Sequence, residues 1–207
     1  MKFNRQRLAA VGVFKQLNMK LTKNTTVDEF SLMLTMAGEK EKSKLIAALD
    51  NISYNGRIGD TVTCTDLSGI TYGQRIKLSE INDKNVLLLP VEVLIGQSPE
   101  WVIKQKIAEL YPFCRMVVKE LERIAKRDEK TFRYTPTADE NKAGIDRLNF
   151  GFFGVLDKIA KRMSVSHAEV EKMPELRVYA MLKIDFETAQ YESRLHKQIT
   201  DKNKLKK

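Results

Sequence analysis

Helix-start signals recur along this chain and constrain its fold more than any other feature. Three of them are capping boxes, in which Thr or Ser precedes Gln or Glu by three positions: Thr71 with Gln74, Thr137 with Glu140, and Ser166 with Glu169. In a capping box each side chain accepts a hydrogen bond from the backbone N–H of the other residue, which satisfies two donors left free at a helix start. A chain with several such starts is expected to consist mainly of helices.

Two helices are predicted before residue 53. Thr25 and Thr26 offer the N-cap of the first helix, which Gly38 is expected to end. The second helix covers residues 39–52. Its inward-facing residues are expected to be Leu45, Ile46 and Leu49.

Prolines mark changes of structure in the middle of the chain. Pro90 interrupts the apolar run at 86–95, so this run is either an extended core segment or a helix broken at the proline. Ser98 and Pro99 start a helix that runs to about Tyr111, where Pro112 kinks or restarts it. Spacings of four, four and three then predict one buried stripe: Phe113, Val117, Leu121 and Ile124.

The C-terminal third is predicted to be a unit of three helices, long, short and long. The first begins at the Thr137 box and continues to Met163, the second begins at the Ser166 box, and Pro174 permits the last. Apolar residues recur along the first helix at three- and four-residue spacing: Ile145, Leu148, Phe152, Val155, Ile159 and Met163. The inner face of the last helix is expected to carry Tyr179, Leu182, Phe186 and Ala189.

The predicted fold class is mainly α with minor β. Brief strands are expected at Val11–Phe14 and, from its β-branched residues, at Thr61–Thr65. The charged, turn-rich stretch after Arg127 predicts a linker at 128–137. It would separate a multi-helix N-terminal domain, 1–127, from a helical C-terminal subdomain with a basic tail, 138–207.

The net charge of +9 is concentrated at the two ends of the 207-residue chain. Residues 1–23 carry six bases and no acid, and residues 194–207 carry six bases and one acid, which leaves 24 bases against 26 acids between them. Such ends either contact nucleic acid or an acidic partner, or are solvated termini. The candidate contacts are Arg5, Arg7, Lys202, Lys204, Lys206 and Lys207. No apolar run is long enough to span a bilayer, and no signal peptide is evident.

Motifs for catalysis are not found. The sequence has no phosphate-binding glycine loop and no serine elbow, and His167 and His196 have no metal ligand at a suitable spacing. Cys64 and Cys114 are more typical of two reduced thiols than of a disulfide. The sequence therefore predicts a protein that is not an enzyme and has no metal site and no cofactor.

Several residues are candidates for a protein-binding surface. Phe150, Phe152 and Phe153 cannot all face one helical stripe, so at least one should cover a second surface. Trp101 is either a core anchor or an interface residue. The surface predicted for a protein partner consists of Tyr72, Arg75, Trp101, Phe150 and Phe153. An alternative is DNA reading by residues 162–183, which have the outline of a helix-turn-helix.

Two stretches resemble a known family. They are Ile-Thr-Tyr-Gly-Gln-Arg-Ile-Lys-Leu within residues 66–81, and Phe-Gly-Phe-Phe-Gly-Val-Leu-Asp with Ala-Glu-Val-Glu-Lys-Met-Pro and Tyr-Glu-Ser-Arg-Leu within 144–195. Together with Ser-Pro-Glu-Trp, these stretches resemble structural and assembly proteins of tailed bacteriophages, above all tail assembly chaperones. The resemblance implies a small helical protein that binds other phage structural proteins or its own copies, in the host cytoplasm during assembly or in the virion.

Overall fold

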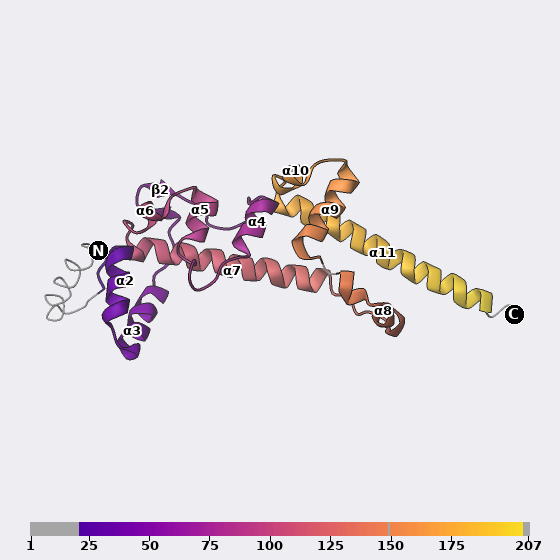
Figure 1. Ribbon diagram of the computed structural model, residues 1–207, viewed down its shortest axis with the longest axis horizontal. Helices are drawn as coiled ribbons and strands as arrows, with labels where there is room; N and C mark the ends of the chain where they lie inside the picture. The colour runs from indigo at the N-terminus through magenta and orange to yellow at the C-terminus, as the bar shows by residue number, and fades with distance from the viewer. Residues whose placement is uncertain (1–20, 149, 205–207) are drawn as a thin grey trace, which may run out of the picture.

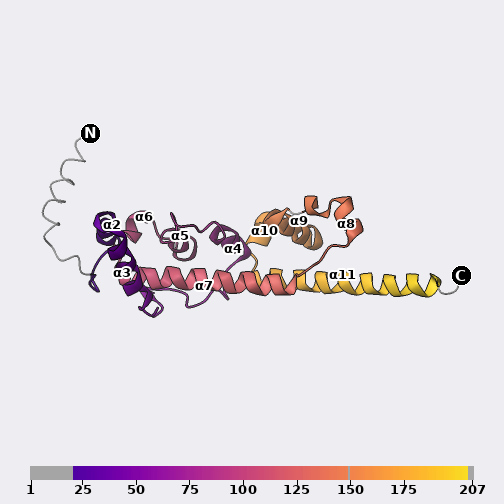
Figure 2. The same cartoon turned by 90° about the horizontal axis from the view of Figure 1, so that it is seen from below.

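The computed structural model describes residues 21–148 and 150–204, so the strand expected at 11–14 lies outside the described residues. The fold is mainly α with one small β-hairpin, which confirms the predicted fold class. Two long helices, α7 (Ile107–Thr131) and α11 (Glu175–Lys204), follow one another along an elongated molecule (Figure 1). The shorter helices lie beside them, as the second view also shows (Figure 2).

The other helices and strands of the described chain are short. In chain order they are α2 (Val27–Met36), α3 (Glu39–Asp50), β1 (Arg57–Ile58), β2 (Thr61–Val62), α4 (Tyr72–Leu78), α5 (Leu89–Ile95), α6 (Pro99–Val102), α8 (Ala138–Ala143), a 3-10 helix (Ile145–Leu148), α9 (Gly151–Met163) and α10 (His167–Glu171). The two strands pair antiparallel, with Ile58 opposite Thr61. The strand expected from residue 61 is therefore present but only two residues long.

Local helix-start signals are confirmed. The three predicted capping boxes form with both hydrogen bonds, at the starts of α4, α8 and α10. A fourth box, Thr26 with Glu29, starts α2. Ser98 caps α6 as expected. The apolar run at 86–95 is neither extended nor a helix broken at Pro90, because residues 89–95 form helix α5 with Pro90 in its first turn.

Predictions about helix ends fail where distant segments bind the backbone. The helix capped by Ser98 ends at Val102 instead of near Tyr111, and α7 begins separately at Ile107. The reason is that the intervening backbone pairs with the start of α2 and the residues just before it. The N–H of Val27 donates to the carbonyl of Gln105 at 2.9 Å, and the N–H of Ile107 donates to the carbonyl of Thr25 at 2.9 Å. Pro112 then lies inside α7.

Three other local predictions are wrong. Ala37 ends α2, and Gly38 is instead the N-cap of α3. Ile46 is 41% exposed, because the core side of α3 is taken by Leu45 and Leu49. The long helix expected from Thr137 to Met163 is divided into α8, the 3-10 helix and α9, since Gly144 adopts a left-handed φ of 81° that ends α8.

The segment predicted as a linker is partly helical. Residues 128–131 belong to the last turn of α7, and residues 132–137 have no regular secondary structure. The inner face expected for α11 is half-buried at Tyr179, Leu182 and Phe186, whereas Ala189 is exposed.

Two hydrophobic clusters meet at α4. The larger one joins α2, α3, the hairpin, α5, α6 and α7, and it includes Leu78 from α4. The smaller one joins α9, α10 and α11, and it includes Tyr72 and Ile76 from α4. The predicted stripe of α7 belongs to the larger cluster, with Phe113 and Val117 fully buried. Helix α4 thus contributes side chains to both cores and holds them together.

The approach of α4 to α10 requires a glycine. A Cβ atom on Gly73 would lie 3.0 Å from the Cβ of Glu171 and 3.1 Å from its carbonyl oxygen. Alanine is normally the better helix residue. Here the contact leaves no room for it, so we expect Gly73→Ala to destabilise the protein by about 1–3 kcal/mol in urea unfolding. Gly69→Ala is the control, because a Cβ there meets no atom within 4 Å; equal effects of the two substitutions would contradict the close approach.

Candidate functional site

The starts of α4 and α11 are joined through their backbones. Thr71 and Pro174 form an isolated antiparallel bridge. The N–H of Tyr72 donates to the carbonyl of Met173 at 2.8 Å, and the N–H of Glu175 donates to that of Ile70 at 2.9 Å. These bonds use donors that a helix start leaves free. They place the first turn of α11 against α4.

A buried ionic network occupies this junction. The Glu175 side chain is 2% exposed, and its Oε1 accepts from Nη1 of Arg75 at 2.7 Å and from Nη2 of Arg127 at 2.5 Å. Both arginines also bind the carboxylate of Asp128, Arg127 through its Nε at 2.9 Å. The guanidinium of Arg127 stacks 3.8 Å from the ring centroid of Tyr179. Two carboxylates and two guanidinium groups thus connect α4, the end of α7 and the start of α11.

The prediction that Tyr72 and Arg75 belong to a partner surface is wrong. Tyr72 is only 2% exposed and packs edge-on against Phe152, with ring centroids 6.1 Å apart. Burial raises the pKa of Tyr72 to about 12. Arg75 is bound to two carboxylates within the protein. Both side chains therefore stabilise the junction, and neither offers a surface to a partner. Glu175, which completes the network, is not among the predicted site residues.

Removing the buried carboxylate should be costly. We expect Glu175→Gln to lower the free energy of unfolding by about 1–3 kcal/mol, because two guanidinium groups lose one of the two carboxylates that they share. The measurement is urea unfolding followed by circular dichroism. Glu39→Gln is the matched control, since the Glu39 side chain is 89% exposed beside Lys42, and it should change stability far less. A similar loss for both variants would show that the network contributes little.

The other three residues predicted for the partner surface, Trp101, Phe150 and Phe153, differ in exposure. Trp101 is half-buried and packs against the larger cluster, as a core anchor does. Phe150 and Phe153 are each 62% exposed, whereas Phe152 packs in the smaller cluster. The three phenylalanines therefore do not share one stripe, as predicted, and the second surface expected to be covered by at least one of them stays a prediction. Leu148, at 68% exposure, lies next to them in the chain and was missed as a surface residue.

The exposed phenylalanines are held in position by their neighbours. Gly154 lies one helical turn after Phe150, and a Cβ there would come within 3.2 Å of the Phe150 Cβ. The glycine thus leaves space for that side chain against the helix. The Phe153 ring stands edge-on to His167 of α10, with centroids 5.3 Å apart. We call Leu148, Phe150 and Phe153 the Phe150 surface; it exposes supported apolar side chains, as protein-binding surfaces do.

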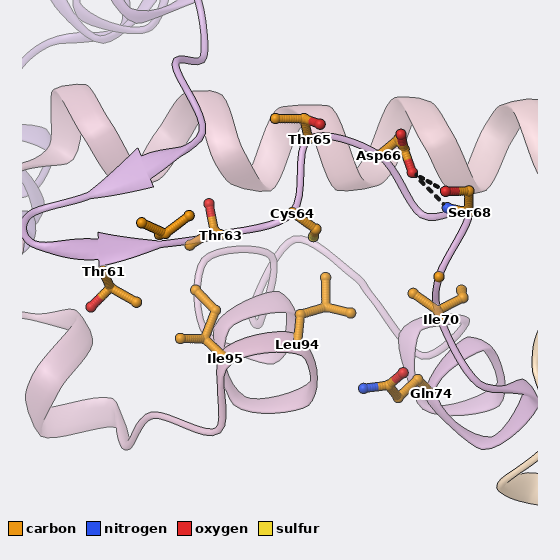
Figure 3. A pocket seen from close by; sticks show the side chains of 12 residues that line it. Thr61, Thr63, Cys64, Thr65, Asp66, Ser68, Ile70, Gln74, Leu94 and Ile95 are labelled. Atoms are coloured by element: carbon orange, nitrogen blue, oxygen red, sulfur yellow. Dashed lines mark hydrogen bonds between the residues drawn. The ribbon is translucent and has the colours of Figure 1, made fainter.

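A pocket of about 630 Å³ lies beside the hairpin (Figure 3). The segment from β2 to Ser68 forms one side, and Gln74, Leu94 and Ile95 form the other. None of its lining residues is Lys, Arg or His. Its carboxylate, on Asp66, accepts from the N–H and hydroxyl of Ser68 at 2.8 and 2.5 Å, which lower its pKa. The lining offers hydrogen-bond donors and acceptors together with the apolar side chains of Leu94 and Ile95, but it places no base next to the thiol of Cys64.

The two free cysteines test this description of the pocket. Cys64 is exposed at the pocket, although surrounding atoms desolvate its thiolate and raise its pKa; Cys114 is 1% exposed, and burial raises its pKa to about 12. At pH 8 we expect a thiol-specific chromogenic reagent to modify Cys64 alone in the folded protein, more slowly than free cysteine. Cys114 should react only after unfolding. Cys64→Ser should leave no reactive thiol in the folded protein, and equal native reactivity of both would contradict the structure.

Two of the six predicted basic contacts, Lys202 and Lys204, lie in the described part of the chain. Arg5, Arg7, Lys206 and Lys207 lie outside the described residues, and Lys204 is placed only as part of α11. Lys202 is exposed on the same helix. Within residues 21–148 and 150–204, no group of three or more His, Cys, Asp or Glu side chains is arranged to hold a metal ion. None of the helices described combines the length and apolarity needed to cross a bilayer.

Comparisons with known proteins identify no relative. The chain matches no protein-family model, no curated protein and no solved structure.

Proposed function

We propose that this chain is a non-enzymatic assembly or structural protein of a tailed bacteriophage, similar to a tail assembly chaperone, that acts by binding other phage proteins. The observation that carries the proposal is the Phe150 surface, where Leu148, Phe150 and Phe153 are each more than 60% exposed. Large apolar side chains that are exposed close together in the chain are typical of protein-binding sites. The surface lies within residues 144–195, one of the two stretches that resemble the chaperones.

In this proposal the ionic network and the pocket beside the hairpin are parts of the scaffold and not sites of catalysis. The ionic network at Glu175 connects helices, and its central carboxylate is only 2% exposed. The pocket beside the hairpin offers hydroxyl groups and one carboxylate but no base next to its thiol. A binding protein needs no more than a stable scaffold that presents a surface. Such a protein would act in the host cytoplasm during assembly or remain in the virion.

A pull-down from the native source tests the proposal. Tagged protein is incubated with nuclease-treated extract at moderate salt, and retained proteins are identified by mass spectrometry. We expect defined phage structural proteins to be retained, and Phe150→Ser with Phe153→Ser to reduce their recovery at least about tenfold, because hot-spot aromatics typically contribute more than 1.4 kcal/mol. Val62→Ser is the control, since Val62 is 69% exposed but belongs to the hairpin. Retention unaffected by the double substitution would exclude this surface.

Nucleic-acid binding is the second candidate, and the C-terminal half of α11 favours it. Arg194, Lys197 and Lys202 are exposed there. The helix-turn-helix version has less support, since Glu175 at the start of α11 is bound to two arginines and packed against α4. Phosphate-driven binding weakens steeply with salt. Loss of all specific partners on nuclease treatment would therefore favour this candidate over the first.

A further inference from the structure

Helix α11 carries an exposed apolar stripe that continues into the part of the helix extending beyond the rest of the molecule (Figure 1, Figure 2). Its members are Ile184, Tyr191, Leu195 and Ile199. Tyr191, Leu195 and Ile199 follow Ile184 by 7, 11 and 15 positions. At about 100° per residue, all four side chains lie within roughly 80° of one another around the helix axis. They are 55%, 59%, 41% and 51% exposed, so no described part of the chain covers them.

This stripe is separate from the face of α11 that packs against the body. Tyr179 and Phe186 contact the ring of Phe132, both with centroids 5.7 Å apart. Asp185, on the edge of that face, binds Lys158 and Arg162 of α9. Tyr179 and Phe186 lie on the opposite side of the helix from Tyr191 and Leu195, about 120–180° away around the axis, whereas Asp185 lies between the two faces, about 80° from Leu195. The stripe is therefore free to contact another molecule.

Charges beside the stripe are distributed unequally along the helix. Between Ile184 and Glu192 the charged residues are all acidic, whereas Arg194, Lys197 and Lys202 follow with Asp201 as the only acid. If two such helices lay parallel, Glu187 of one would face Glu192 of the other, five positions on, as flanking residues do in parallel coiled coils. If they lay antiparallel and crossed near Tyr191, Glu187 of each would lie within reach of Arg194 of the other.

We infer that a second copy of this chain covers the stripe, with the two α11 helices antiparallel and crossing near Tyr191. The four apolar residues of each copy then bury one another, and the acidic half of each helix lies beside the basic half of its partner. Because the same patch is used by both copies, the pairing closes as a twofold dimer and leaves no free patch for further growth. The inference does not depend on the proposed function, since the Phe150 surface belongs to other helices.

The first test is the mass of the full-length chain in solution, measured by light scattering and by sedimentation over a range of concentrations. We expect a dimer of twice 23.8 kDa. Tyr191→Asp with Leu195→Asp should weaken dimerisation at least about 100-fold. Ala189→Asp is the matched control, because Ala189 is exposed on the opposite side of the same helix, and it should remain dimeric. Unchanged helical content and melting temperature would show that the variants are folded.

The second test concerns the direction of the pairing. Glu187→Arg should weaken an antiparallel dimer about three- to tenfold at low salt, and adding Arg194→Glu should restore it. In a parallel dimer Glu187→Arg would instead strengthen the association by removing a clash with Glu192. That result would overturn the antiparallel arrangement. A monomer at all concentrations would overturn the inference, even if the stripe then binds another protein or nucleic acid. A dimer unaffected by Tyr191→Asp with Leu195→Asp would also overturn it.

Discussion

The shared contacts of Glu175 with Arg75 and Arg127 hold together parts of the chain that are 100 and 48 residues apart. A carboxylate this deeply buried is stable only when its charge is matched, and two guanidinium groups with well-directed donors provide that match. Since the three residues come from α4, α7 and α11, the network fixes the direction in which α11 leaves the body. The elongated shape and the exposure of the second half of α11 follow from that direction.

The two hydrophobic clusters depend on the same junction in a different way. The smaller cluster has few fully buried side chains, namely Ile159, Val170 and Val178. A core of this size gives limited stability by itself. The smaller cluster is stabilised further by the packing of Tyr72 and Ile76 of α4 and by the close approach of α4 to α10 that Gly73 permits. The C-terminal helices are thus packed onto the N-terminal body instead of forming a fully independent unit.

Both proposed interaction surfaces lie in the C-terminal part of the chain, on the 3-10 helix, α9 and α11. The larger cluster lies within α2, α3, the hairpin and α5–α7. The 3-10 helix, the start of α9 and α11 carry large apolar side chains that are exposed. Leu148, Phe150 and Phe153 form one surface, and the stripe around Tyr191 forms another. An elongated molecule can present two such surfaces at once. A protein that pairs with its own copy and also binds another protein would need this separation.

The sequence by itself determined the fold class, the capped helix starts, the buried stripe of α7 and the divergence of Phe150 and Phe153 from Phe152. These depend on interactions within one or two helical turns, such as the bond between Thr71 and Gln74. Only the tertiary structure decided that α6 ends at Val102, that Tyr72 and Arg75 are internal, and that Glu175 is buried. In each of these cases the partner is far away in the chain: residues 25–28 for the end of α6, and α7 and α11 for Arg75. Such pairings follow from how whole helices pack, which no local spacing of residues records.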